Sequence, residues 1–178
     1  MPFKQKAKYD RNGNMVRPET TTATFVLGYK GYIQLAIRSG QYKDLEAMEI
    51  KQGEYLGRDP ETGKVKFQFI EDDDERETLP TIGYMAYFEY NPPKGSTTGF
   101  RKTIYWSKEK MMTHADTYSK AFSRQGYEDL QAGRVPEKDM WRYSSFWYKN
   151  FDDMARKTLT RHLISHWGIM SIDMQTAL

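Results

Sequence analysis

The longest helical pattern in the chain lies near its end, over residues 150–170, and its two faces differ in kind. At about 100° per residue, apolar side chains gather on one side of this helix: Ala155, Leu159, Leu163 and Trp167. Polar and mostly basic side chains gather on the other side: Lys157, Thr158, Arg161 and Ser165. Asp152 and Asp153 suit the start of a helix, and Gly168 suits its end. The pattern predicts a helix that packs on one face and presents cations on the other.

A second helical pattern, over residues 27–39, repeats this arrangement. Its predicted packing side is aromatic and aliphatic: Tyr29, Ile33, Ala36, Ile37 and Gly40. Its other side carries a polar residue at every fourth position: Lys30, Gln34 and Arg38. Lysine and arginine usually cover a solvated helix surface, and either row alone has that explanation. Two helices with the same pattern favour the alternative, in which the cations face a polyanion.

Alternating apolar and polar residues between the two helices predict four strands, over residues 45–51, 64–70, 81–90 and 100–106. The third strand has large apolar side chains on one face: Ile82, Tyr84, Ala86, Phe88 and Tyr90. A turn over residues 59–63 joins the first two strands, and the acidic run 71–77 with Pro80 is expected to form the next loop. Short connections imply antiparallel pairing. The predicted fold is therefore α+β, an antiparallel meander sheet packed against helices.

Local signals predict smaller features of the fold. Asn12-Gly13 is typical of a hairpin turn, and residues 3–9 are expected to pair with residues 22–26. Ser107 is a natural N-cap for a helix that runs to about residue 120. Residues 119–145 contain glycine and proline without a clean period, so we expect a loop with room for one short helix.

The length of 178 residues and the hydrophobic content of 38% predict a single globular domain over residues 1–178. No apolar run approaches 18 residues and no charged-then-apolar leader is present, so we expect neither a membrane span nor secretion. The chain has no cysteine. Disulfides, thiolate catalysis and cysteine-built metal sites are therefore excluded.

The net charge of +3 hides an uneven distribution. The run EDDDERE at residues 71–77 holds six acids and one arginine. Removing it from the 27 basic and 24 acidic residues leaves 26 against 18, or +8. A basic remainder of this size favours an anionic partner, because nucleic acids and acidic surfaces both attract it.

No catalytic or metal-binding motif is complete in the sequence. Residues 57–65 resemble a phosphate-binding loop, but five residues separate the glycines instead of four, and Val65 replaces the Ser or Thr that binds magnesium. His162 and His166 have a zinc-compatible spacing without an evident third ligand. The acids at residues 72–75 are expected to form a polar loop rather than a metal site. We therefore expect no active centre, no enzyme activity and no metal.

Aromatic residues interleave with the basic rows, as Tyr29 does with Lys30 and Trp106 with Lys108. A further aromatic cluster precedes the last helix: Trp141, Tyr143, Phe146, Trp147 and Tyr148. Proteins that bind single-stranded nucleic acid combine cations for the phosphates with rings that stack on the bases. Most of the 13 tyrosines, nine phenylalanines and four tryptophans must form the core, so few are expected to reach a ligand.

Three separated segments occur in a characteristic order: FVLGYKGYIQLAIRSGQYK at residues 25–43, TIYWSKEKM at 103–111 and NFDDMARKTLTRHLISHWGIMSIDMQTAL at 150–178. Together they closely resemble the RecT family of phage and prophage single-strand annealing recombinases. The resemblance covers nearly all of the chain.

The resemblance implies a cytoplasmic protein of a bacterial host cell that binds single-stranded DNA and anneals it to a complement without ATP. It implies a homo-oligomeric ring or helical filament, a partner exonuclease, and a groove between a helix and the sheet for the DNA backbone and the annealed duplex intermediate. No cofactor is expected, and magnesium would only modulate annealing. By position, the DNA-binding residues would be Tyr29, Lys30, Gln34, Arg38, Trp106, Lys108, Lys157, Thr158 and Arg161.

Family members normally extend further at both ends, so this chain looks truncated, and its self-association and full annealing activity do not follow from the resemblance. Two other hypotheses remain open at this point. The chain could be an interaction module that docks a host single-strand-binding protein or the partner exonuclease, without annealing activity. Alternatively, it could be a metal-dependent nuclease that uses Asp152 or the acidic run.

Overall fold

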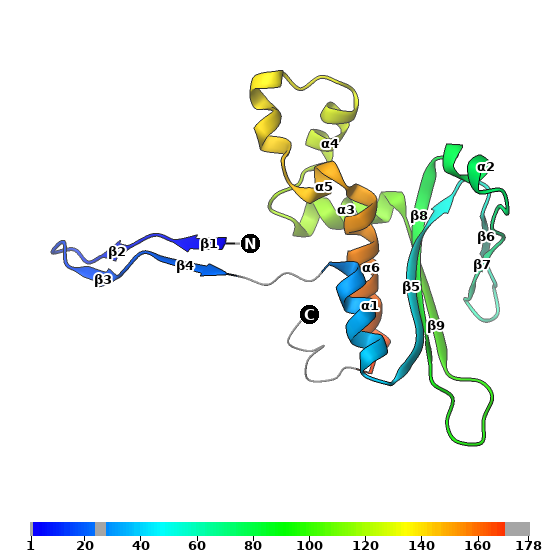
Figure 1. Ribbon diagram of the computed structural model, residues 1–178. Helices are drawn as coiled ribbons and strands as arrows, with labels where there is room; N and C mark the ends of the chain where they lie inside the picture. The colour runs from blue at the N-terminus through cyan, green and yellow to red at the C-terminus, as the bar shows by residue number, and fades with distance from the viewer. Residues whose placement is uncertain (1, 24–27, 170–178) are drawn as a thin grey trace.

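The computed structural model describes residues 2–23 and 28–169 and is built around a three-stranded antiparallel sheet of order β5-β8-β9 (Figure 1). The central strand β8, Thr81–Tyr90, has the bounds that the alternation predicts. It pairs on one side with β5, Tyr42–Lys51, and on the other with β9, Arg101–Ser107. The α+β class, with an antiparallel sheet packed against helices, is confirmed.

Two helices lie side by side on one face of this sheet: α1, Tyr29–Arg38, and α6, Phe151–Trp167 (Figure 1). β8 turns the ring of Tyr84 and that of Phe88 toward them, and both side chains are fully buried. From α6, the predicted packing residues Ala155, Leu159 and Leu163 are also fully buried. The hydrophobic core therefore lies between the sheet and these two helices.

Three predicted packing residues are exposed: Trp167, Ile37 and Gly40, the last of which lies beyond the end of α1. Trp167 is 40% exposed, because it is the last residue of α6 and its ring meets the Nζ of Lys102, 4.8 Å away, at the surface. Ile37 is 42% exposed, because the buried stripe of α1 runs through Tyr32 and Ala36 instead. The predicted start of this helix at residue 27 lies outside the described residues.

The prediction of a single four-stranded sheet is wrong in one respect. The predicted strand at residues 64–70 is shorter, β7 at Val65–Phe67, and it pairs with β6, Tyr55–Arg58, in a separate two-stranded ribbon. This ribbon lies on the opposite side of the sheet from α1 and α6 (Figure 1). The ring of Tyr55 stacks on that of Tyr105 in β9, with centroids 4.6 Å apart, and so attaches the ribbon to the outer face of the sheet.

The acidic run is a helix and not the predicted loop. α2, Asp73–Thr78, begins after Asp72, whose carboxylate accepts a hydrogen bond from the backbone N–H of Glu75. Acids in its first turn suit the positive end of the helix dipole. An aspartate at the cap and acids in the first turn are signals of a helix start that the sequence itself contains.

The single arginine of this run, Arg76, forms an ion pair with the fully buried carboxylate of Glu54. Burial alone would raise the pKa of Glu54, but hydrogen bonds from Arg76 and from the backbone N–H groups of Lys51 and Ile70 outweigh it and lower the pKa. Arg76 also donates to the carbonyl oxygen of Glu49, 2.8 Å away. This network ties α2 and the loop before β6 to strand β5.

Helix α3, Lys108–Tyr118, follows β9 directly, and Ser107 caps it as predicted by accepting a hydrogen bond from the backbone N–H of Lys110. The segment expected to be mostly loop contains more helix: α4, Arg124–Gln131, and the 3-10 helix η1, Glu137–Tyr143. The short helix α5, Phe146–Lys149, then leads into α6. Ser123 caps α4 by accepting a hydrogen bond from the backbone N–H of Gly126, a local signal that does not need a long apolar period.

The N-terminal strands form one long hairpin that extends away from the sheet and its helices (Figure 1). β1, Pro2–Gln5, pairs with β4, Thr20–Ala23, while β2, Lys8–Tyr9, pairs with β3, Met15–Arg17. The predicted Asn12-Gly13 turn is confirmed, with Gly13 at a φ of 80° that favours glycine. The expected pairing of residues 3–9 with residues 22–26 is wrong for most of its length: Phe3 pairs with Thr22, but the paired residues after it have partners between Met15 and Thr21. The expected partners 24–26 lie outside the described residues.

Gly168 ends α6, as predicted, but for a reason other than backbone freedom. Its φ of −84° is open to any residue, whereas an added Cβ would lie 2.5 Å from the hydroxyl of Tyr42. That hydroxyl donates to the carbonyl oxygen of Ile169, and the hydroxyl of Tyr90 donates to that of Trp167. The two tyrosines therefore fix the end of α6 against β5 and β8.

The buried Glu54–Arg76 pair leads to a prediction about stability. Arg76→Met should lower the free energy of unfolding by about 3 kcal/mol, because it leaves the buried carboxylate of Glu54 without its countercharge. Adding Glu54→Gln should recover part of this loss, since the buried group is then neutral. Urea unfolding measures both effects.

The matched control is Glu77→Gln, an exposed substitution in the same helix, which should change the free energy of unfolding by no more than about 0.5 kcal/mol. If Arg76→Met were as stable as this control, the Glu54–Arg76 pair would not hold α2 in place.

Candidate nucleic-acid interface

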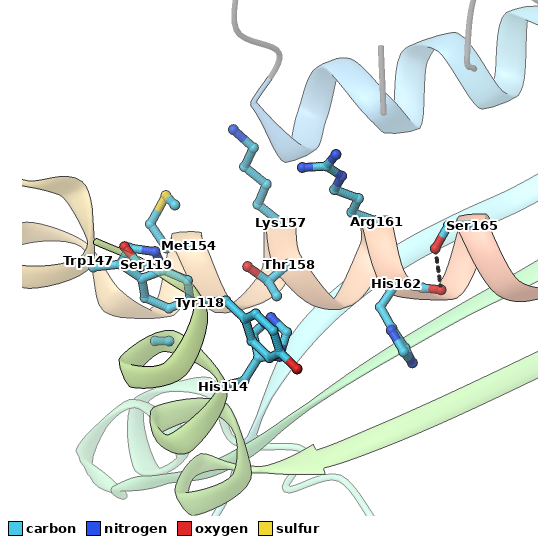
Figure 2. Close-up of a pocket in the computed structure, with 11 residues that line it drawn as sticks. His114, Tyr118, Ser119, Trp147, Met154, Lys157, Thr158, Arg161, His162 and Ser165 are labelled. Carbon is cyan, nitrogen blue, oxygen red and sulfur yellow. Dashed lines mark hydrogen bonds between the residues drawn. The ribbon is translucent and has the colours of Figure 1, made fainter. Parts of the chain in front are cut away.

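A cavity of about 540 Å³ opens between α3 and α6 (Figure 2). Helix α6 supplies its cationic and polar lining, and α3 supplies an imidazole and a phenol ring. The lining residues that matter to the chemistry are His114, Tyr118, Lys157, Thr158, Arg161 and His162. Three residues predicted from the helical period, Lys157, Thr158 and Arg161, therefore lie in one cavity.

Lys157 and Arg161 extend from the same side of α6, one helical turn apart (Figure 2). Burial and the neighbouring charge of Arg161 both lower the pKa of Lys157. Neither cation forms an ion pair with any acid in residues 2–23 or 28–169, although ten ion pairs occur there. Two adjacent cations that repel each other and lack a countercharge form a site that favours an anion.

The apolar packing of α6 sets the direction of these cations. Ala155 and Leu159 are fully buried against the sheet, which turns the side of the helix that carries Lys157 and Arg161 outward. At the start of α6, the carboxylate of Asp152 accepts a hydrogen bond of 2.5 Å from the hydroxyl of Tyr84 in β8. Burial, and then this contact with a carboxylate, raise the pKa of Tyr84, so its hydroxyl keeps its proton. The hydrogen bond fixes the first turn of α6 on the sheet.

A column of aromatic rings forms the other side of the cavity. The ring of Tyr118 packs on that of His114 at 4.7 Å, and His114 packs on Trp106 at 5.1 Å. Trp106 also contacts the ring of His162, at 4.8 Å. The column runs from α3 across the end of β9 to α6, because Trp106 lies between the two helices in space.

The two histidines of this column have lowered pKa values. Burial and the nearby Lys110 lower the pKa of His114. Burial, His166 and then Lys110 lower the pKa of His162. Both imidazoles are therefore neutral near pH 7 and gain a proton only at a more acidic pH than usual.

The other residues predicted on β9 and α3 do not line the cavity. Trp106 is only 8% exposed, and the Nζ of Lys110 lies 4.5 Å from its ring centroid. Its ring is enclosed by neighbouring side chains and supports the column from within. Lys108 is half-buried in the first turn of α3 and does not line the cavity.

The predicted row on α1 is exposed but does not line this cavity. Lys30, Gln34 and Arg38 all face solvent on α1, which packs against α6. Tyr29 is half-buried, and the guanidinium of Arg156 lies 5.0 Å from its ring centroid. The structure therefore separates the predicted set into a cavity group on α6 and an exposed row on the adjacent helix.

Sequence reasoning missed the contribution of α3, in particular Tyr118 and His114. His114 and Tyr118 are four positions apart on one helix, a spacing that places them on the same face. Nothing in the sequence indicates that this face meets α6, because the crossing of two helices is a tertiary feature.

The nuclease hypothesis depends on Asp152 or on the acidic run. Asp152 accepts the hydrogen bond from Tyr84, and Asp72 of the acidic run accepts the hydrogen bond that caps α2. Within residues 2–23 and 28–169, no group of three or more histidines and acids is placed to hold a metal ion. No helix in the same residues is long and apolar enough to cross a membrane.

Comparison with known proteins identifies the chain's relatives. The model of the RecT family matches residues 15–178. An uncharacterized protein of Bacillus subtilis (strain 168), YqaK, is 38% identical over 157 residues, which are 88% of this chain and 44% of the relative. The chain thus spans less than half the length of this curated relative. The matched residues include all those that form the sheet, α3 and α6, and we conclude that the chain belongs to the RecT family.

Proposed function

We propose that this chain binds single-stranded DNA at the cavity between α3 and α6 and anneals complementary strands without ATP. The observation that carries the proposal is the pair Lys157 and Arg161, which line the cavity without an acidic partner among the described residues. Membership of the RecT family supports a general role in recombination by single-strand annealing. The pair is the site that we propose for that role.

The mechanism follows from charge and needs no covalent step. Two complementary strands repel each other through their phosphates, and cations that neutralise phosphates reduce this repulsion. Lys157 and Arg161 would hold the backbone of one strand, with Thr158 as a hydrogen-bond donor to a phosphate oxygen between them. Bases that are not held by the protein remain free to pair with a second strand. Such binding is indifferent to sequence, as annealing requires.

The exposed row on α1 extends the cationic surface beyond the cavity. Lys30, Gln34 and Arg38 lie on a helix that packs beside α6, so one strand could contact both helices in succession. Lys108, at the start of α3, would contribute charge from the other side. In this proposal Tyr29 and Trp106 act indirectly, through Arg156 and through the ring column.

Assembly and partners belong to the proposal as well. We propose that copies of the protein form a ring or a helical filament on DNA in the bacterial cytoplasm, beside a partner exonuclease and a host single-strand-binding protein. The match covers only 44% of the length of YqaK. Assembly and annealing can therefore also depend on segments of the kind that YqaK has outside the match.

The direct test is annealing of two complementary dye-labelled oligonucleotides added one after the other, without ATP, with light scattering to follow assembly. We expect pairing faster than in buffer alone, and particles that grow when the second strand arrives. Binding of the first strand without accelerated pairing would contradict the annealing part of the proposal. The same result would favour the alternative role as an interaction module.

A second prediction concerns the salt dependence of binding. Lys157→Ala with Arg161→Ala should weaken binding of single-stranded DNA and reduce the slope of log K against log salt by about 1.4, the value for two phosphate contacts. Fluorescence anisotropy at several salt concentrations measures this slope.

The matched control is Arg58→Ala with Lys64→Ala, which removes the same net charge from the β6–β7 ribbon on the opposite side of the sheet. It should leave the slope unchanged. Equal slopes for the two double variants would show that α6 does not bind DNA. Equal losses of binding to DNA and to an acidic peptide, on changing Lys157 and Arg161, would favour the interaction-module hypothesis.

A third prediction concerns pH. His114 and His162 have lowered pKa values, so they are neutral at pH 7 and add positive charge to the cavity only as the pH falls below about 6.5. A bound phosphate favours their protonated forms, and affinity for single-stranded DNA should therefore rise as the pH falls below about 6.5. Anisotropy titrations at constant ionic strength measure the change.

The sign is opposite for folding. The unfolded chain takes up these protons at the ordinary histidine pKa, so the stability that depends on neutral imidazoles is present above that pKa and declines as the pH falls below it. Binding must therefore be measured where circular dichroism shows a folded chain. In His114→Gln with His162→Gln the rise in affinity should shrink, and an unchanged pH profile would exclude these two residues.

A further inference from the structure

We propose that Tyr118 is a stacking platform for one unpaired nucleobase at the mouth of the cavity. This inference rests on the proposed binding of single-stranded DNA and assigns the base contact that the cations alone do not provide. Tyr118 was not among the residues predicted from the sequence. It is the last residue of α3 and lines the cavity together with Lys157 and Arg161 (Figure 2).

The ring of Tyr118 packs against one aromatic neighbour among the described residues. Its support is the imidazole of His114, at a centroid distance of 4.7 Å, which packs in turn on the buried Trp106. The column continues through His162 to His166, whose rings lie 4.0 Å apart. A ring backed by a packed column has little freedom to move away from a ligand, which is what a preorganised contact requires.

The remaining surface of the ring is open. Tyr118 is 74% exposed, and its ring packs against no other aromatic side chain among the described residues. One exposed aromatic side chain needs no special explanation on its own. Here the exposed ring shares a cavity with two cations that lack an acidic partner, and rings beside unpaired cations are what proteins use to hold single strands.

The chemistry favours a nucleobase over other flat ligands. A phosphate held by Lys157 or Arg161 leaves its nucleotide's base within reach of the cavity mouth, where the tyrosine face can stack on a purine or a pyrimidine. Stacking of this kind tolerates any sequence, because every base has a π-face. It also requires that the base be unpaired, so the contact distinguishes a single strand from a duplex.

The experiment compares the folded chain with Tyr118→Ala, using two probes of equal length. One probe is oligothymidylate, and the other is the same strand with several bases removed to leave abasic sites. Loss of one stacked base typically weakens binding by about tenfold. We expect Tyr118→Ala to bind oligothymidylate about tenfold more weakly than the unmodified chain does, with the same salt slope.

The abasic probe isolates the base contact, because its phosphate charge is unchanged. The unmodified chain should lose affinity for this probe relative to oligothymidylate, and Tyr118→Ala should lose much less. Tyr118→Phe should behave as the unmodified chain does, since it keeps the ring and loses only the hydroxyl. A thermal melt of each variant shows whether it is folded.

Trp141→Ala is the matched control, because Trp141 is 70% exposed but does not line the cavity. It should leave affinity for both probes unchanged. The inference is overturned if folded Tyr118→Ala binds oligothymidylate as tightly as the unmodified chain, if its loss on the abasic probe equals that of the unmodified chain, or if Trp141→Ala produces the same pattern. An unmodified chain that binds neither probe would instead contradict the proposed function itself.

Discussion

The packing of α6 against the sheet is the constraint on which the rest of the structure depends. Leu159 and Leu163 are fully buried, and Ala155 lets the helix approach the strands closely because its side chain is small. Tyr84 fixes the first turn through Asp152, while Tyr42 and Tyr90 hold the residues that follow the last turn. With both ends attached, α6 can neither rotate nor slide without breaking buried contacts. The direction of every side chain on its outer face follows from this packing.

The distribution of ion pairs explains how a modest net charge yields a cationic cavity. Several acids form ion pairs with cations outside the cavity: Glu89 with Lys43 and Arg101, and Glu54 with Arg76. Within α6, Arg156 forms ion pairs with Asp153 of the same helix and with Glu49 of β5. Asp153 and Glu49 therefore pair with Arg156, and neither acid pairs with Lys157 or Arg161. Net charge alone does not reveal such an arrangement, because it depends on which face each acid occupies.

The sequence predicted features whose signals are local and missed those that depend on tertiary contacts. The bounds of β8, the cap at Ser107 and the buried face of α6 follow from alternation, a serine before a helix and helical period. The separate β6–β7 ribbon could not be predicted, since short strands pair equally well with several neighbours until packing such as that of Tyr55 on Tyr105 selects one arrangement.

The candidate site divides in the same way. The cations of α6 were predictable because a helical period gathers them on one face, and the structure places Lys157 and Arg161 together. Tyr118 was not predictable, since its role depends on where α3 crosses α6. Trp106 was predicted to bind DNA, but it is buried under the helices. Its neighbour Tyr105 lies on the opposite face of the sheet, because successive side chains of a strand alternate between faces.

Charge and ring come from different helices in this cavity, and that separation suits annealing. Contacts to phosphates weaken with salt but ignore the state of the base, whereas stacking on a ring requires an unpaired base. If α6 supplies the first and α3 the second, the cations can retain a strand after pairing while the ring contact is lost. The strand is then held most strongly before it pairs and less strongly afterwards. A protein that promotes annealing needs this difference, because a site that bound single strands too tightly would oppose formation of the duplex.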